Sequence, residues 1–204
     1  MFGLDYSNPG RHTEEYVQIV ASLLAGESAQ HDGVEFKVHT PALPLASEAK
    51  VSLLVSALAP RLLRVAGTYA DGTVLWMANA KAVERHVVPR IRKAAADAGR
   101  PDPRIVVGLP VSVHDDINEA REVAARLFAV YAQLPNYQRI LAYGDVAGPA
   151  EAAIVGDEGS VSRQVQALFD AGATDVWAAP FPAAEDGKAS RQRTRALLKE
   201  LAAS

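Results

Sequence analysis

The residue types that most often carry catalysis are either missing from this sequence or not spaced for it. There are no cysteines, which excludes disulfides, thiolate metal ligands, cysteine nucleophiles and iron–sulfur clusters. The sequence also lacks a dinucleotide glycine fingerprint, a P-loop, a nucleophile elbow and a His-Glu-x-x-His motif. No two of the five histidines have metal-ligand spacing on one predicted element: His12, His31, His39, His86 and His114. We therefore expect no metal site, and we assign no catalytic residue.

The most suggestive chemical feature is a set of small residues that follows an apolar run. The run VSLLVSA at 51–57 is typical of a strand buried on both faces, and Ala57-Leu58-Ala59 then lead into a helix. Small residues let a ligand approach the backbone, and the first N–H groups of a helix attract an anion such as phosphate. Arg61, in the first turn of that helix, becomes interesting if phosphate binds there. The alternative is a tight turn whose small residues serve packing, and spacing alone favours that alternative.

Trp76 is the second candidate, because it stands where a later strand meets its loop. In parallel α/β folds the active site lies at the carboxyl ends of the strands. The strand TVLWM at 73–77 is followed by Ala78-Asn79, so Trp76 could form one wall of a pocket for a planar ligand. It could equally be a core aromatic residue. Tyr131, Pro135 and Tyr137 could form a lid, or could simply pack a helix end.

An alternation of strands and helices must position these residues. The predicted core strands are 51–57, 73–77, 104–113 and 174–179. The predicted helices lie at 10–25, 59–71, 80–98, 117–131 and 157–172, with a last helix around Leu197–Leu201. Residues 34–38 predict an exposed strand or hairpin arm, and 135–155 predict short helices and loops. Pro89 lies inside the helix at 80–98 and should bend it.

Composition indicates an ordinary globular protein. The chain has 204 residues, of which 49% are apolar, and a net charge of −3. We expect a single domain over 1–204 with no nucleic-acid partner, since such binders usually present a basic face. No apolar run has the roughly 18–20 residues of a membrane span, and the first residues lack a signal-peptide pattern. We expect a cytoplasmic protein with a small-molecule substrate and no membrane partner.

Strands that alternate with helices imply parallel βαβ units. Two architectures fit: an open doubly wound sheet, or part of a (β/α)8 barrel. A complete barrel usually needs about 250 residues and eight strands. With four clear core strands, this chain is too short for one.

The sequence SALAPRLLRVAGTYADGTVLWMANAKAVERHVVPRI resembles the luciferase-like monooxygenase superfamily, specifically its F420-dependent oxidoreductases. The similarity is carried by four segments in order, at 56–76, 108–116, 155–158 and 171–175. It extends over about residues 10–182. Each segment is weak alone, and their order makes the set specific.

The resemblance implies a partial (β/α)8 TIM barrel of the bacterial luciferase-like type. Residues 51–57 would be the fifth barrel strand, so the chain would hold about strands 5–8 as parallel βα units. Residues 27–50 would be an insertion within the domain. The first four strands would have no counterpart, which leaves two interpretations: Met1 is an internal start, or the chain is a truncated homologue.

The resemblance also implies a cofactor and a site. The backbone of Ala57, Leu58 and Ala59 would contact the cofactor phosphate with Arg61 nearby, although many relatives have glycine at the position of Ala59. Trp76 and Asn79 would face the cofactor or the substrate. The implied chemistry is hydride transfer with coenzyme F420, and FMN is the alternative. The family usually forms homodimers, so we expect a homo-oligomer. The competing hypotheses are a non-catalytic half-barrel that binds or assembles, and an open α/β phosphate-binding domain.

Overall fold

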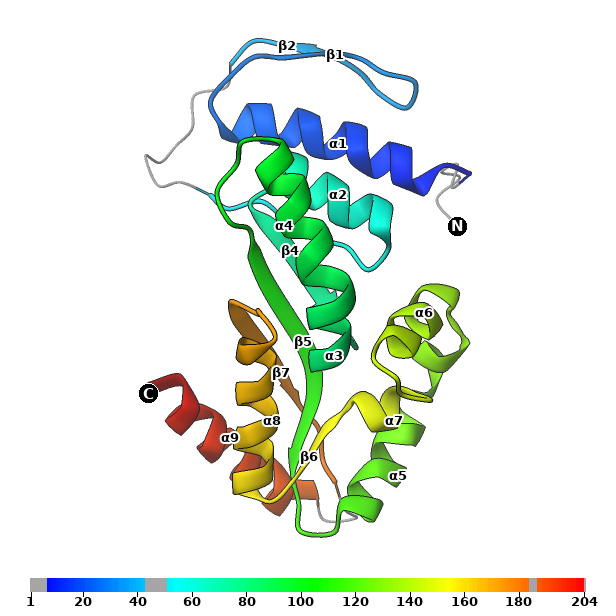
Figure 1. Ribbon diagram of the computed structural model, residues 1–204, viewed down its shortest axis with the longest axis vertical. Helices are drawn as coiled ribbons and strands as arrows, with labels where there is room; N and C mark the ends of the chain where they lie inside the picture. The colour runs from blue at the N-terminus through cyan, green and yellow to red at the C-terminus, as the bar shows by residue number, and fades with distance from the viewer. Residues whose placement is uncertain (1–6, 43–50, 184–186, 204) are drawn as a thin grey trace. The chain divides into compact units, whose positions relative to one another are not determined.

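The computed structural model describes residues 7–42, 51–183 and 187–203 (Figure 1). The chain divides into two compact units. The first contains Met1–Thr73 and Arg90–Pro103, and the second contains Val74–Pro89 and Arg104–Ser204. Within the described ranges, no helix combines the length and apolar character needed to cross a bilayer. The predicted single domain over 1–204 and the insertion at 27–50 stay predictions.

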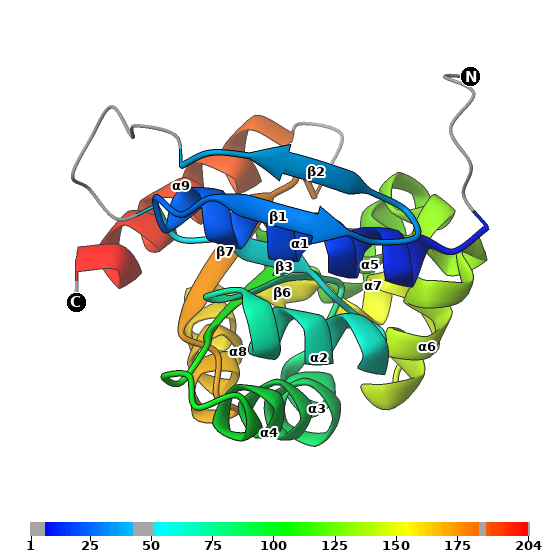
Figure 2. The same ribbon diagram turned by 90° about the horizontal axis from the view of Figure 1, so that it is seen from above.

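The first unit begins with α1 (Pro9–Leu24) and a hairpin of β1 (Ala29–Asp32) and β2 (Lys37–Thr40). The helix α1 starts at the proline after Asn8, within one residue of the predicted start at 10, and Gly26 follows it with φ +76°. The two strands pair antiparallel, from Ala29 opposite Thr40 to Asp32 opposite Lys37. The hairpin lies along α1 (Figure 2). The predicted hairpin arm at 34–38 therefore sits slightly too early in the chain.

A buried carboxylate joins α1 to this hairpin. Glu15 is 9% exposed, and its carboxylate accepts the backbone N–H groups of residues 34, 35 and 36 at 2.9–3.1 Å. Burial alone would raise the pKa of Glu15, but these N–H donors and the His31 ring outweigh it, and the pKa is lowered. The turn between the strands is thus held by charge-assisted hydrogen bonds.

The rest of the first unit packs around β3 (Leu54–Ser56) and α2 (Pro60–Tyr69). A Cβ on Gly67 would lie 2.5 Å from the carbonyl oxygen of Ile91, so this glycine allows α2 to pack closely against α4 (Val88–Asp97). The start of β4 (Gly72–Trp76) lies beside β3. The hydroxyl of Thr73 donates a hydrogen bond to the carbonyl of Val55 at 2.8 Å.

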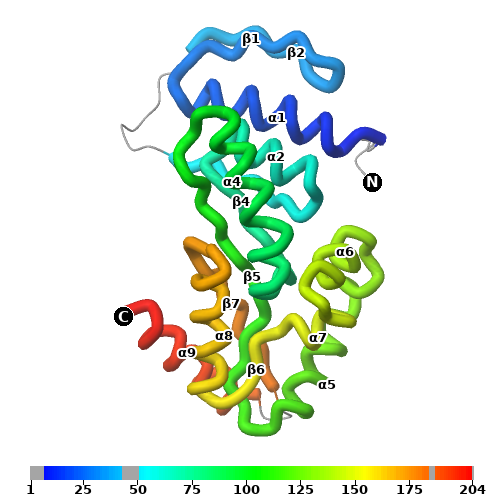
Figure 3. The backbone as a smooth tube through the Cα atoms, in the orientation of Figure 1, coloured from blue at the N-terminus to red at the C-terminus, as the bar shows by residue number. Residues whose placement is uncertain are grey.

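The second unit is built on β5 (Arg104–Val113; Figure 3). The ends of β5 match those of the predicted strand. It pairs in parallel with β7 (Asp175–Pro180), from Val106 opposite Asp175 to Val111 opposite Pro180. It also pairs in parallel with β6 (Ile154–Gly156) further along the strand. The end of β4 lies next to β5, since Met77 N–H donates to the carbonyl of Gly108 at 3.1 Å.

Helices connect and flank these strands. They are α5 (Ile117–Leu127), a 3-10 turn at Ala129–Gln133, α6 (Pro135–Tyr143), α7 (Pro149–Ala152), α8 (Glu158–Asp170) and α9 (Gly187–Ala203). The helix α8 lies within the predicted range 157–172, and Asp157 caps it, since its side chain accepts the N–H of Ser160. The short strand β6 was not predicted. Its three residues are too few to show a period of two.

The predicted helix at 80–98 is interrupted. It consists of α3 (Ala80–Ala82), a π-helical turn at Val83–Val87, and α4. Pro89 has no N–H and its ring crowds the carbonyl one turn earlier, so the preceding turn widens to i→i+5 hydrogen bonds. The distortion that we predicted as a bend is therefore a π turn.

Candidate functional site

The small-residue turn at Ala57–Ala59 belongs to the first unit. Ala57 is fully buried, and Ala59 is the N-cap of α2 with an extended backbone (φ −87°, ψ 151°). Alanine has no polar side-chain atom, so the turn supplies no side-chain cap to the helix. The first N–H groups of an α-helix have no partner within the helix. The first N–H groups of α2 are therefore donors that suit an anion or water.

Arg61 is tied to α1 in this structure. Its Nη2 donates to Glu14 Oε2 at 2.9 Å, and its side chain is about half exposed. A Cβ on Gly10 would lie 2.9 Å from Arg61 Cδ, so the aliphatic part of the side chain also packs on α1. Part of the positive charge that a phosphate would need is therefore already compensated. The predicted phosphate role of Ala57, Leu58, Ala59 and Arg61 stays a prediction.

The second unit contains the loop that joins β4 to α3. Met77 adopts φ +64° although it is not a glycine, and it is fully buried. A bulky residue in the left-handed region is uncommon and costs of order 1–3 kcal/mol, and such strain clusters at functional sites. The surrounding contacts that hold Met77 in place include its hydrogen bond to Gly108.

Both polar atoms of the Asn79 side chain, two residues later, form hydrogen bonds within the protein. Its Oδ1 accepts the N–H of Ala82 at 3.0 Å and caps α3, while its Nδ2 donates to the carbonyl of Gly144 at 2.9 Å. A Cβ on Gly144 would collide with this amide. The predicted contact of Asn79 with cofactor or substrate stays a prediction, and the visible role of this side chain is to join two loops.

Trp76 lies in a cluster of aromatic rings. Its ring centroid is 5.3 Å from Trp177, 6.0 Å from Tyr131 and 6.3 Å from Phe128. Further ring pairs extend the cluster: Phe128 with Phe181 at 5.7 Å and Tyr131 with Tyr137 at 4.7 Å. Burial, and to a lesser extent the neighbouring Tyr131, raises the pKa of the Tyr137 phenol, so this group stays neutral at physiological pH.

Gly108 makes this arrangement possible. A Cβ at this position would lie 2.7 Å from a Trp177 ring atom and 2.9 Å from a Trp76 ring atom. The absence of a side chain therefore lets two indoles lie directly over β5.

The indole N–H of Trp76 is buried and has no hydrogen-bond partner among the described residues. A buried donor without an acceptor costs about 1–3 kcal/mol. Trp177, in contrast, is 54% exposed. The cluster thus combines open aromatic surface with one donor that still needs an acceptor, which suits binding of a flat ring rather than proton transfer.

Sequence reasoning identified Trp76 and missed its neighbours Trp177, Gly108 and Phe128. Trp177 was simply part of a predicted strand. A glycine inside the β-branched run RIVVGLPVSV was a usable signal, because glycine in a strand often marks a close approach of another group. Among the residues that the structure describes, no group of three histidine or acidic side chains could hold a metal ion.

Comparison with known families places the chain. The model of the luciferase-like monooxygenase family matches residues 1–175. The chain belongs to the luciferase-like monooxygenase family. This confirms the resemblance noted in the sequence.

Several solved structures are similar in fold to this chain over part of their own length. An F420-dependent secondary alcohol dehydrogenase, in complex with an F420–acetone adduct, matches with a TM-score of 0.74 at 17% identity, over 97% of this chain and 64% of its own. The coenzyme F420-dependent tetrahydromethanopterin reductase of Methanopyrus kandleri matches with 0.64 at 21%, over 90% and 61%. A riboflavin lyase with modified FMN and riboflavin matches with 0.64 at 14%, over 98% and 59%.

This chain therefore spans less than two thirds of the length of each of these structures. Its α/β fold, with a parallel sheet and flanking helices, corresponds to part of a luciferase-like (β/α)8 barrel, as the sequence predicted. Identities this low show the fold alone.

Proposed function

We propose that this chain is an oxidoreductase of the luciferase-like class that transfers a hydride between coenzyme F420 and a small organic substrate. The observation that carries the proposal is the aromatic cluster around Trp76, with its buried, unpartnered indole N–H. Membership of an oxidoreductase family and the presence of F420-dependent proteins among the matched structures support it.

In each unit taken by itself, one feature fits a part of a flavin-like group. Trp76 and Trp177 offer apolar ring surface, and the Trp76 N–H could donate to a carbonyl or ring nitrogen of a planar heterocycle. In the first unit, the uncapped start of α2 after Ala57, Leu58 and Ala59 could hold a phosphate, with Arg61 adding charge beyond its pair with Glu14.

A bound deazaflavin supplies the two-electron chemistry, and the protein binds, orients and shields it. Trp76 and Trp177 would hold a ring in one orientation and exclude water from one of its faces. The Trp76 N–H would fix the direction of the ring by a single hydrogen bond. The strained Met77 keeps the end of β4 in place beside Gly108, so that Trp76 is held before a ligand binds.

The first test is a titration of the purified chain with coenzyme F420 and, separately, with FMN. Binding should be followed by cofactor absorbance and by the fluorescence of the two tryptophans. Saturable binding of F420 with a change in tryptophan emission is expected. No binding to either cofactor by a folded sample would remove the enzyme proposal and favour a non-catalytic half-barrel that binds or assembles.

A variant separates the phosphate contact from the ring contact. Ala59→Asp places a carboxylate where the phosphate should lie, so it should abolish cofactor binding by like-charge repulsion. It should leave the fold intact, because aspartate is a good N-cap residue. Unchanged affinity would contradict the phosphate assignment to Ala57–Ala59.

The second candidate is an FMN-dependent monooxygenase of the same superfamily, and a matched structure that contains modified FMN favours it. Preferential binding of FMN in the same titration would replace F420 in the proposal. A homo-oligomer and a cytoplasmic location stay predictions. Light scattering would test the first of these.

A further inference from the structure

The second unit has a cleft between its strands and helices. The cleft has a volume of about 320 Å³ and is lined by residues of α3, β5, α7, β6 and α8 and of the loops before α3 and after α6, all of them in this unit. Its lining includes three buried aliphatic side chains, Leu109 of β5, Ile154 of β6 and Leu168 of α8. A cleft formed by several elements can surround a small ligand.

This cleft lies apart from the aromatic cluster around Trp76. Gly108 faces the rings of Trp76 and Trp177, and Leu109 is the next residue of β5. Successive residues of a strand point to opposite faces of the sheet. A ligand in the cleft would therefore lie on the other side of β5 from the aromatic rings, and its binding does not depend on the proposed function.

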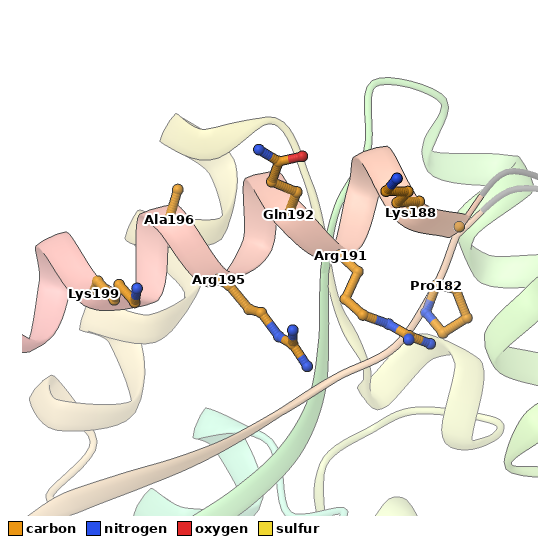
Figure 4. Close-up of a pocket in the computed structure, with 8 residues that line it drawn as sticks. Pro182, Lys188, Arg191, Gln192, Arg195, Ala196 and Lys199 are labelled. Atoms are coloured by element: carbon orange, nitrogen blue, oxygen red, sulfur yellow. The ribbon is translucent and has the colours of Figure 1, made fainter.

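A wider depression lies on α9. It has a volume of about 840 Å³ and is lined by side chains of that helix and by Pro182 (Figure 4). Because a single helix provides nearly all of the lining, a small ligand there would stay open to solvent. The smaller cleft, with walls from several elements, is the better binding site.

Three charged side chains line the cleft: Lys81, Asp145 and Glu151. The carboxylate of Asp145 lies close to two cations, since its Oδ2 is 2.9 Å from Nη1 of Arg85 and 3.4 Å from Nζ of Lys81. The charges of Lys81 and Asp145 therefore compensate each other within the protein.

Glu151 has no such compensation. Its Oε2 accepts the backbone N–H of Ala147 at 2.8 Å, and within residues 7–42, 51–183 and 187–203 no cation forms an ion pair with it. A carboxylate can accept about four hydrogen bonds, so one neutral N–H leaves most of this capacity, and the whole of the charge, to a ligand. The cleft thus combines aliphatic walls with one uncompensated negative charge.

We infer that this cleft binds a small primary amine with an aliphatic body. The ammonium group would donate charge-assisted hydrogen bonds to Glu151, and the body would contact Leu109, Ile154 and Leu168. A water molecule takes about 30 Å³ of liquid volume, so the cleft has room for about ten waters. An amine of roughly eight non-hydrogen atoms suits that space.

Other ligands of the same shape fit less well. A carboxylate would meet Lys81, but it would also lie near the negative charges of Asp145 and Glu151. A neutral alcohol would contact the same aliphatic side chains and leave Glu151 without a cation.

The test compares three ligands of one shape: cyclohexylmethylamine, the neutral cyclohexylmethanol and the anionic cyclohexanecarboxylate. Each is titrated at neutral pH into the whole chain with isotope-labelled leucine and isoleucine methyl groups, which are observed by NMR. The amine should shift the methyl signals of Leu109, Ile154 and Leu168 saturably. The alcohol and the carboxylate should bind about fivefold more weakly, as expected for the loss of one exposed ion pair.

Glu151→Gln removes the charge and keeps an acceptor for the N–H of Ala147. It should lower the affinity for the amine about fivefold. Its affinity for the alcohol should equal that of the parent, which would show that the cleft is intact. Glu122→Gln is the matched control, because Glu122 is an exposed carboxylate of the same unit outside the cleft, and it should bind the amine like the parent.

Several outcomes of these titrations would overturn the inference. They are amine binding that does not saturate, equal or tighter binding of the alcohol or the carboxylate, and methyl shifts confined to other parts of the chain. An unchanged amine affinity in Glu151→Gln, or an equal loss in Glu151→Gln and Glu122→Gln, would overturn it too.

Discussion

Two buried polar groups, one in each unit, differ in whether they have hydrogen-bond partners. In the first unit the carboxylate of Glu15 accepts three backbone N–H groups and lies 3.4 Å from His31. In the second unit the indole N–H of Trp76 has no acceptor among the described residues. A satisfied group is explained by the stability of the fold, whereas an unsatisfied one costs stability and calls for another explanation. This contrast is why Trp76 is the better functional candidate.

The largest expected effect comes from adding a side chain at Gly108, where the rings of Trp76 and Trp177 approach the backbone of β5. Gly108→Ala would place a Cβ 2.7 Å from the carbonyl oxygen of Leu75 and equally close to Trp177, so the backbone or both indoles must move. We expect a loss of about 3 kcal/mol in the free energy of unfolding, measured by urea denaturation, together with loss of cofactor binding.

Gly148→Ala is the matched control for that variant, because a Cβ there meets nothing within 4 Å. It should unfold like the parent. If Gly108→Ala is as stable as Gly148→Ala and binds cofactor normally, the two indoles do not lie over β5 as described. The argument that Trp76 is held ready for a ligand would then be wrong.

The next effect tests the satisfied group. Glu15→Gln removes the charge that strengthens the hydrogen bonds to the hairpin turn, and should cost about 2 kcal/mol of unfolding free energy. Cofactor affinity should not change. Since the pKa of Glu15 is lowered in the folded state from its ordinary value of 4.5, its contribution is present above about pH 4.5 and is lost as the pH falls through the folded pKa.

Urea denaturation between pH 6 and pH 3 measures that dependence. The parent chain should lose more stability over this range than Glu15→Gln does. Parallel pH curves for the two proteins would show that the carboxylate contributes nothing that depends on its charge.

These residues also show how far sequence reasoning reaches. Strands and helices with clear periodicity, such as β5 and α1, could be located from the sequence, and small-residue and strand-end arguments led to Ala57–Ala59 and Trp76. Glu15 and Trp177 could not be assigned a role, because their partners lie far away in the chain: Glu15 contacts a turn about 20 residues later, and Trp177 meets a ring about 100 residues earlier. Periodicity reports which face of an element is buried and not what covers it.

A smaller effect asks whether the Trp76 N–H serves a ligand. Trp76→Phe keeps a ring and removes the donor, so the free energy of unfolding should change by no more than about 1 kcal/mol, since an unsatisfied donor disappears along with some packing. Affinity for F420, measured by cofactor absorbance, should fall about tenfold, the equivalent of one hydrogen bond of about 1.4 kcal/mol.

Trp177→Phe is the control, because it removes an indole whose N–H is not buried without a partner. This variant should bind F420 more tightly than Trp76→Phe does. If Trp76→Phe raises the free energy of unfolding and leaves the affinity for F420 unchanged, the Trp76 N–H is an unsatisfied donor with no role in binding.

The smallest effect concerns Arg61, the one charged candidate in the first unit. Its pair with Glu14 is half exposed and should contribute less than about 1 kcal/mol to stability. If Arg61 also serves a phosphate at Ala57–Ala59, Glu14→Gln releases it and should raise cofactor affinity by about twofold, while Arg61→Ala should lower affinity by a similar factor. Arg64→Ala is the control, because Arg64 lies 3.9 Å from the same carboxylate but further along α2. Opposite shifts for Glu14→Gln and Arg61→Ala, with none for Arg64→Ala, would give the first unit a binding role alongside Trp76. If none of these three variants changes the affinity for the cofactor, Arg61 forms only a surface ion pair. Ligand binding would then be assigned to the second unit alone.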